Sequence, residues 1–162
     1  MGLPRASYEN KVDTVALYAL SGTPVAYPSA YSLQFNQTVR PDQATSLDFI
    51  FDIDSAGHAM LLPTGALRLG RASGIQLTTT PFDSIKIAPT AKYQLDSAVV
   101  IDSNDVALLH SIPTVCTYGI STVYYAKLHV LSIDLASRKM NFEILTDINC
   151  GYRGLEPGLP RR

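Results

Sequence analysis

Apolar and polar side chains alternate along several stretches of the chain, and residues 46–54 show this most clearly. The apolar positions share one side of an extended backbone and the acidic positions share the other. This period of two is typical of a half-buried β-strand with its polar face in solvent. The apolar set is Leu47, Phe49, Phe51 and Ile53, and the acidic set is Asp48, Asp52 and Asp54.

Turn-forming residues join such stretches into predicted β-hairpins. In the first hairpin the connection contains Gly57, which suits the positive φ of a tight turn. In the second, Lys127 and His129 fall on the polar face of their strand. The connection of the third is rich in Asp, Ser and Asn, whose side chains bond their own backbone in turns. The three hairpins are 46–54 with 58–62, 124–130 with 139–147, and 98–101 with 106–109.

Shorter apolar stretches predict further strands, and they are separated by ten glycines and ten prolines spread along the chain. No stretch is long enough for the crossover helices of a parallel sheet, and we expect at most short helical turns at 64–71 and 135–138. The pattern predicts an all-β fold, an antiparallel β-sandwich or flattened barrel of roughly eight to eleven strands. The further strands are predicted at 12–20, 31–35, 74–78, 84–87 and 114–118.

Length and composition fit one domain over residues 1–162, with residues 1–11 loosely held and residues 151–162 forming an irregular tail. Hydrophobic residues make up 46% of the chain, which is enough to fold without a metal. The net charge of −1 excludes the basic surface of a nucleic-acid-binding protein. No apolar run approaches the roughly 20 residues that cross a bilayer, so we expect no transmembrane segment.

The acidic loop after the first predicted strand invites a metal-site hypothesis with Asp52, Asp54 and His58 as candidate ligands. An EF-hand loop needs oxygen ligands at its fifth and twelfth positions, and here those positions hold Ala56 and Pro63. The favoured interpretation is that the aspartates cap a turn and keep that face solvated. His110 and His129 lie far from this loop in the sequence and are interpreted as ordinary rim or surface histidines.

Motifs for catalysis and for cofactor binding are missing from the sequence. There is no G-x-S-x-G nucleophile elbow, no phosphate-binding loop and no dinucleotide-binding glycine motif. The sequence therefore predicts no catalytic residue and no cofactor, and it favours a protein that is not an enzyme.

Two cysteines, Cys116 and Cys150, lie too far apart for a zinc or redox motif. In a cytosolic protein they would be buried thiols, and in an exported protein they would form a disulfide. We favour the disulfide, because Cys116 lies in a predicted strand and Cys150 directly follows the last one, as a clamp on the tail would. Such a bridge would contribute roughly 3–4 kcal/mol in the chain-entropy model.

Three segments of the chain resemble a family of bacterial exported proteins of unknown function, many of them lipoproteins. The resemblance spans Val12 to Pro160, and its most specific part is the motif Asn149-Cys150-Gly151-Tyr152-Arg153 with the tail that follows. It implies export, and thus an oxidising compartment in which the disulfide would persist. It implies no activity. This sequence departs from an exported precursor, because no apolar leader follows Arg5 and no lipobox cysteine is present. The other two segments are Leu47–Asp54 and Tyr125–Leu128.

Together these observations predict a non-catalytic exported binding or structural module that acts through its loops or an exposed sheet edge. One alternative is a carrier of a small apolar ligand in a lipocalin-like barrel. Another is a hydrolase with an unrecognised site. The partner would be another protein or a second copy of the chain, and a lipid anchor could have been present in the precursor. The expected location is the periplasm, the cell surface or the extracellular medium, after removal of a leader.

Overall fold

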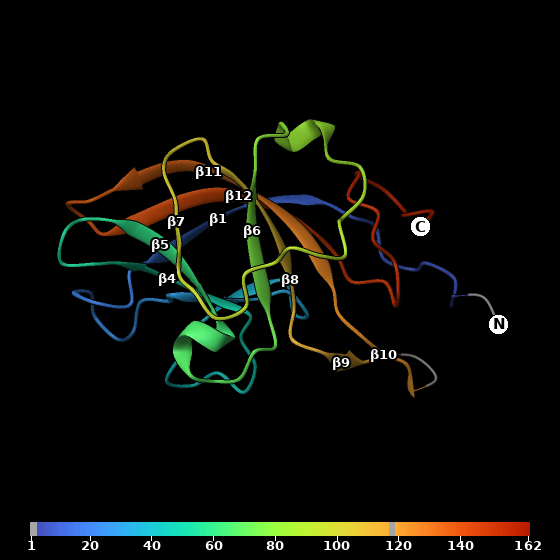
Figure 1. Ribbon diagram of the computed structural model, residues 1–162, viewed down its shortest axis with the longest axis horizontal. Helices are drawn as coiled ribbons and strands as arrows, with labels where there is room; N and C mark the ends of the chain where they lie inside the picture. Colours follow the sequence, from blue (N-terminus) through green and yellow to red (C-terminus); the bar gives the residue numbers. More distant parts are fainter. Residues whose placement is uncertain (1–2, 117–118) are drawn as a thin grey trace.

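The computed structural model describes residues 3–116 and 119–162, and within them two five-stranded antiparallel sheets and a two-stranded ribbon (Figure 1). The first sheet has the order β1 (Val12–Tyr18), β12 (Lys139–Asp147), β11 (Tyr125–Asp134), β8 (Val106–His110) and β6 (Gly74–Thr78). The second has the order β3 (Gln37–Val39), β2 (Ala30–Ser32), β4 (Phe49–Ile53), β5 (Ala59–Pro63) and β7 (Val99–Val100). The ribbon pairs β9 (Thr114–Val115) with β10 (Ser121–Thr122).

The two sheets pack as a sandwich, because each presents an apolar face to one shared core. Three aromatic rings meet at the centre of this core. The Tyr31 and Phe49 ring centroids are 5.7 Å apart, and the Phe142 ring meets both edge-on. These side chains fill the space between the sheets, so the all-β sandwich expected from the alternating pattern is confirmed.

Two of the three predicted hairpins form as the sequence indicates. Strand β4 pairs with β5 around a turn in which Gly57 has φ of +86°. Strand β11 pairs with β12, with an irregularity in register between Val130 and Ser132. Apolar residues at alternate positions of both hairpins lie in the shared core.

The third predicted hairpin is wrong, because its two strands belong to different sheets. Strand β7 pairs with β5 in the second sheet, whereas β8 pairs with β11 and β6 in the first. The Asp-rich turn between them crosses the sandwich, and the N–H of Asn104 donates to the carbonyl of Val130 in β11. Local turn chemistry is the same for a hairpin and for a crossing between sheets, so the pattern could not separate them.

Other predicted elements are shorter than expected or absent. Residues 84–87 form no strand, and a 3₁₀ turn, η2 (Phe82–Ser84), occupies the start of this segment. The helical turn predicted at 64–71 is the 3₁₀ helix η1 (Thr64–Leu67), while 135–138 is a hairpin turn. The strand predicted at 114–118 is reduced to β9, and its last two residues lie outside the described residues.

A second apolar cluster lies on the outer face of the first sheet. The segment around η2 and the C-terminal tail cover one half of that face, where Leu108 and Leu145 are buried against Phe82, Ile85 and Leu155. Lys127, which the alternation placed on a solvated face, is 2% exposed under this cover. Its Nζ donates to the carbonyls of Phe82 and Ile85 at 2.8 and 3.1 Å, so the buried ammonium is hydrogen-bonded.

Asp48 is a second correction to the solvated face predicted for residues 46–54, because it is 2% exposed. Its carboxylate accepts the N–H of Leu33 at 2.6 Å and the N–H of Ile112 at 2.8 Å. The side chain therefore ties two loops to the start of β4, and burial raises the pKa of this carboxyl.

Different segments of the chain lie at the two ends of the sandwich. Figure 1 shows both termini and the β9–β10 ribbon at one end, and the β4–β5 and β11–β12 hairpin loops at the other. The N-terminal segment is held at Asn10, which is 2% exposed and forms a backbone bridge to Gly158 in the irregular tail. Among the described residues, no helix has the length and apolar character to span a membrane.

Candidate functional site

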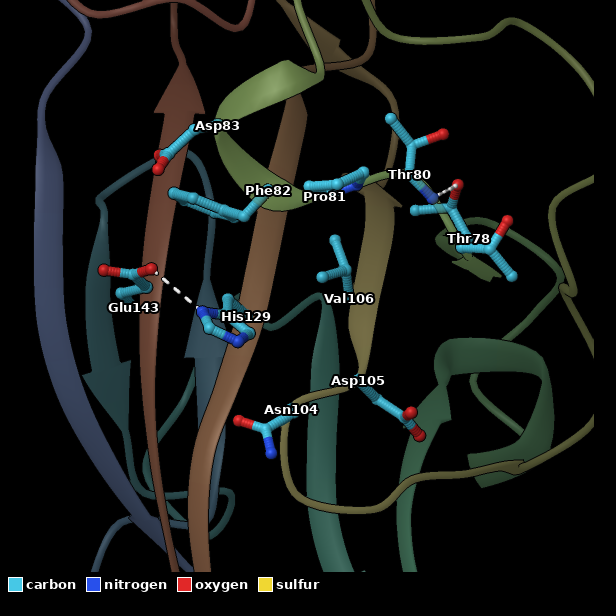
Figure 2. Close-up of a pocket in the computed structure, with 11 residues that line it drawn as sticks. Thr78, Thr80, Pro81, Phe82, Asp83, Asn104, Asp105, Val106, His129 and Glu143 are labelled. Atoms are coloured by element: carbon cyan, nitrogen blue, oxygen red, sulfur yellow. Dashed lines mark hydrogen bonds and ion pairs between the residues drawn. The ribbon is translucent and has the colours of Figure 1, made fainter.

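An open depression on the outer face follows one row of cross-strand neighbours. In register across the first sheet these are Thr14, Glu143, His129, Val106 and Thr78, one from each strand. An open pocket of about 580 Å³ lies over the last four of them. Pro81, Phe82 and Asp83 of the η2 segment form one side of this pocket, next to His129 and Val106 (Figure 2).

The pocket contains a histidine–carboxylate pair from adjacent strands. The His129 Nδ1 atom lies 3.0 Å from Oε1 of Glu143, and both side chains are about one quarter exposed. The His129 ring stacks on the ring of Phe82 with 6.0 Å between centroids. Figure 2 shows Asp83 above the pair and Asn104 with Asp105 at the opposite rim. The charged side chains that line the pocket are therefore mainly acidic.

The His129–Glu143 pair has the two groups of a general base and its orienting acid, but a covalent mechanism also needs a nucleophile. In the part of the chain that the structure describes, no hydroxyl or thiol hydrogen-bonds to His129. Sequence reasoning missed this pair, because it treated His129 as an isolated histidine. The signal was available, since both residues occupy polar positions of the correctly predicted β11–β12 hairpin.

The candidate metal ligands from the sequence are placed in and beside the β4–β5 turn. Asp54 accepts the N–H groups of Ala56 and His58, and its Oδ2 lies 3.1 Å from Nδ1 of His58. The hydrogen bond from the His58 backbone is the main cause of a lowered pKa for Asp54. Asp52 instead accepts the N–H and hydroxyl of Ser21. The aspartates therefore act as turn and loop caps.

These residues do not gather into a metal centre. Over residues 3–116 and 119–162, no group of three or more His, Cys, Asp or Glu side chains could hold a metal ion. His110 lies in a different cluster, with its ring edge-on to Tyr93 at 4.7 Å, and burial lowers its pKa. The three histidines are thus separate in space as they are in sequence.

The two cysteines form the predicted disulfide, with Cα atoms 5.9 Å apart. Cys150 follows the end of β12, and Cys116 follows β9, so the bridge fastens the β9–β10 ribbon to the main sheet. The bridge closes a loop over a sequence separation of 34 residues.

Strand β1 forms an edge of the first sheet whose backbone groups are open over part of its length. Ala19 donates its N–H to Arg138 on the β12 side, whereas Tyr18 donates to Pro28 on the other side. Because antiparallel residues alternate in direction, the N–H and C=O groups of Thr14 and Ala16 also point away from β12. Within the described residues, no hydrogen-bond partner meets these groups.

The opposite edge of the same sheet is closed by the chain itself. In β6, Ile75 exchanges backbone hydrogen bonds with Gln94 at 3.0 and 2.7 Å, and the Gln76 side chain donates to Ala91. Leu77 is the next residue that faces away from β8, and it is 44% exposed. The β1 edge therefore offers the longer run of open backbone groups of the two.

No family model and no curated protein matches the chain.

Proposed function

We propose that the protein is a non-catalytic, exported binding module that takes up an extended polypeptide segment along the open edge of β1. The observation that carries this proposal is the set of outward-facing backbone groups at Thr14 and Ala16. A partner strand would bond these groups as an added strand of the sheet, with main-chain hydrogen bonds supplying much of the affinity.

The immediate surroundings of the edge suit such an added strand. Val12 is 43% exposed and Thr14 is also exposed, so solvent reaches this end of the edge. The segment that ends at Pro28 meets the edge at Tyr18 and marks where an added strand would stop. At this stop the rings of Tyr18 and Tyr27 lie 4.6 Å apart, providing an aromatic surface for a partner side chain.

The two other hypotheses have less support. A lipocalin-like carrier needs a closed barrel with an apolar interior, whereas here two separate sheets enclose rings and aliphatic chains in contact. A hydrolase needs a nucleophile beside the His129–Glu143 pair. The binding module requires neither feature.

Export is the second part of the proposal, and the disulfide supports it. Disulfides persist in the periplasm, at cell surfaces and in the extracellular medium, while cytosolic reductants keep thiols reduced. The resemblance of the tail around Cys150 to exported proteins points in the same direction. A module working there would meet its partner outside the cytoplasm.

Amide exchange with a peptide library tests the binding proposal. Short synthetic peptides that alternate threonine with valine would serve as the probe, because this pattern favours an extended strand. We expect the best binder to slow hydrogen exchange at the Thr14 and Ala16 amides, which donate no hydrogen bond within the described residues and should exchange quickly in the protein alone. A library in which no peptide protects these amides would overturn the proposal, as would a dimer that protects them without peptide.

Proline substitutions supply the matched control. Thr14→Pro removes an outward N–H while sparing the hydrogen bonds to β12, so the sheet should persist and peptide binding should be lost. Leu77→Pro makes the same change on the opposite edge of the same sheet and should leave binding unchanged. Ala16→Pro provides a second test should Thr14→Pro unfold the protein, and equal binding by wild type and both β1 variants would refute the model.

A further inference from the structure

We infer that the strand bound at β1 carries a cationic side chain at the position facing Thr14, where it reaches the carboxylate of Glu143. This inference rests on the proposed binding function and specifies the chemistry of its partner. It follows from the row that links the β1 edge to the acidic pocket.

The register makes Thr14 the only residue of the sheet between an added strand and Glu143. Thr14 is the direct cross-strand neighbour of Glu143, and both side chains emerge on the outer face. Neighbouring strands lie about 4.8 Å apart, so the added backbone would lie about 10 Å from that of β12. A lysine or arginine stem can cross the short Thr14 side chain and bring its charge to Glu143.

The free oxygen of Glu143 faces the correct way for this contact. Its Oε1 atom is occupied by His129 on the β11 side. Figure 2 shows the other oxygen turned away from His129, and β12 lies between β11 and β1. That oxygen therefore faces the β1 side of the sheet, from which the added strand would approach.

The surrounding charges favour a cation at this row. Asp83 and Asp105 line the same pocket as Glu143. The nearest buried cation, Lys127, lies in the adjacent row and donates to the carbonyls of Phe82 and Ile85 beneath the covering segment. Lys139 is two rows away in the other direction, with its Nζ 5.7 Å from the Tyr18 ring centroid. A cationic side chain of the bound strand is therefore favoured at the row of Glu143.

The neighbouring position of the partner strand has a different preference. Two residues further along β1, toward the N-terminus, the outward-facing residue is Val12, whose side chain is exposed and apolar. An apolar partner residue there would bury Val12 and cover the edge beside Leu145. The expected partner is therefore a strand with a basic and an apolar residue two positions apart.

Three peptides of one alternating threonine–valine sequence, differing only in a central lysine, methionine or glutamate, test the charge preference. At low ionic strength we expect the lysine peptide to bind wild type about threefold more tightly than the methionine peptide, and the glutamate peptide to bind less tightly than both. This preference should shrink with added salt, because the Glu143 contact is partly exposed.

Glu143→Gln should abolish the difference between the lysine and methionine peptides, while Glu9→Gln, which removes the same net charge from an exposed site in the segment before β1, should preserve it. If all three peptides protect Thr14 and Ala16 equally, the binding proposal stands and the cationic preference is wrong. If none protects these amides, the binding function itself fails. A lysine preference that survives Glu143→Gln would also overturn the assignment to this carboxylate.

Discussion

The outer face of the first sheet has a covered half and an open half, although the alternating pattern of β11 runs through both without a break. Lys127 lies in the covered half at 2% exposure. His129, two residues along the same face of the same strand, has a side chain that is 26% exposed. The difference arises from the η2 segment, which crosses over Lys127 and ends its cover at Phe82.

This contrast shows that a polar residue in an alternating strand pattern does not reveal whether its side chain is buried or exposed. Lys127 remains compatible with the covered half because two carbonyls accept hydrogen bonds from its ammonium, and the centroid of the Phe82 ring lies 4.5 Å from its Nζ. His129 and Glu143 need no cover, since they bond each other at the surface. The covered half should therefore contribute stability and the open half recognition.

Removing the buried ammonium should give the largest effect on stability. Lys127→Met keeps most of the apolar stem but leaves the carbonyls of Phe82 and Ile85 without their donor. An unsatisfied buried polar group costs about 1–3 kcal/mol, and we expect a loss of about 2 kcal/mol in the free energy of unfolding. Urea unfolding at constant m-value measures it, and a loss below about 0.5 kcal/mol would contradict the role given to Lys127.

Asp147, at the end of the covered half, should give a pH-dependent effect. Its Oδ1 accepts two hydrogen bonds from Asn149, while its buried Oδ2 has no partner among the described residues, and neither does the buried Oδ1 of Asn10. Burial raises the pKa of this carboxyl in the folded state. Protonated Asp147 therefore contributes stability below a pH of about 3.9, the pKa of an aspartate in the unfolded chain. This contribution is lost as the pH rises through the higher pKa that the carboxyl has in the folded state.

Asp147→Asn should remove this dependence, because an amide supplies a donor at every pH. The wild type should therefore lose stability relative to the variant as the pH rises above about 4. Chemical unfolding of both proteins across that range is the measurement. Asp48, whose pKa burial also raises, is present in both proteins and cancels in the difference. A difference that does not change with pH would show that folding does not raise the pKa of Asp147.

The smallest effect is expected in the open half. His129→Ala removes a partly exposed hydrogen bond to Glu143 and a ring contact with Phe82, and pairs of this exposure contribute at most about 1 kcal/mol. Thermal or urea unfolding should show a smaller loss than for Lys127→Met. An equal or larger loss would mean that the two halves do not differ in the way their burial suggests.

Much of the fold could be read from local alternation. The β4–β5 and β11–β12 hairpins and the strand at 74–78 were predicted, because neighbouring residues and turn chemistry specify them. The Cys116–Cys150 bridge was favoured over free thiols because of where the two cysteines stand relative to the predicted strands, and it forms. The same rules failed at residues 98–109, where a turn connects two sheets and does not close a hairpin.

The candidate site could be predicted from the sequence only in part. The hairpin register contains the His129–Glu143 pair, but the neighbours that complete the row, Thr14 and Val106, come from distant strands. The open edge at β1 depends on strand order, which no local pattern encodes.

Periodicity therefore established that this chain folds into antiparallel sheets with one apolar face each, because side-chain direction alternates residue by residue. Which polar residues are buried, which sheet each strand joins and which edge stays open depend on segments far apart in the sequence. Those contacts arise when the η2 segment and the tail pack over the finished sheet, and this is why Lys127 and His129, alike in pattern, have different roles.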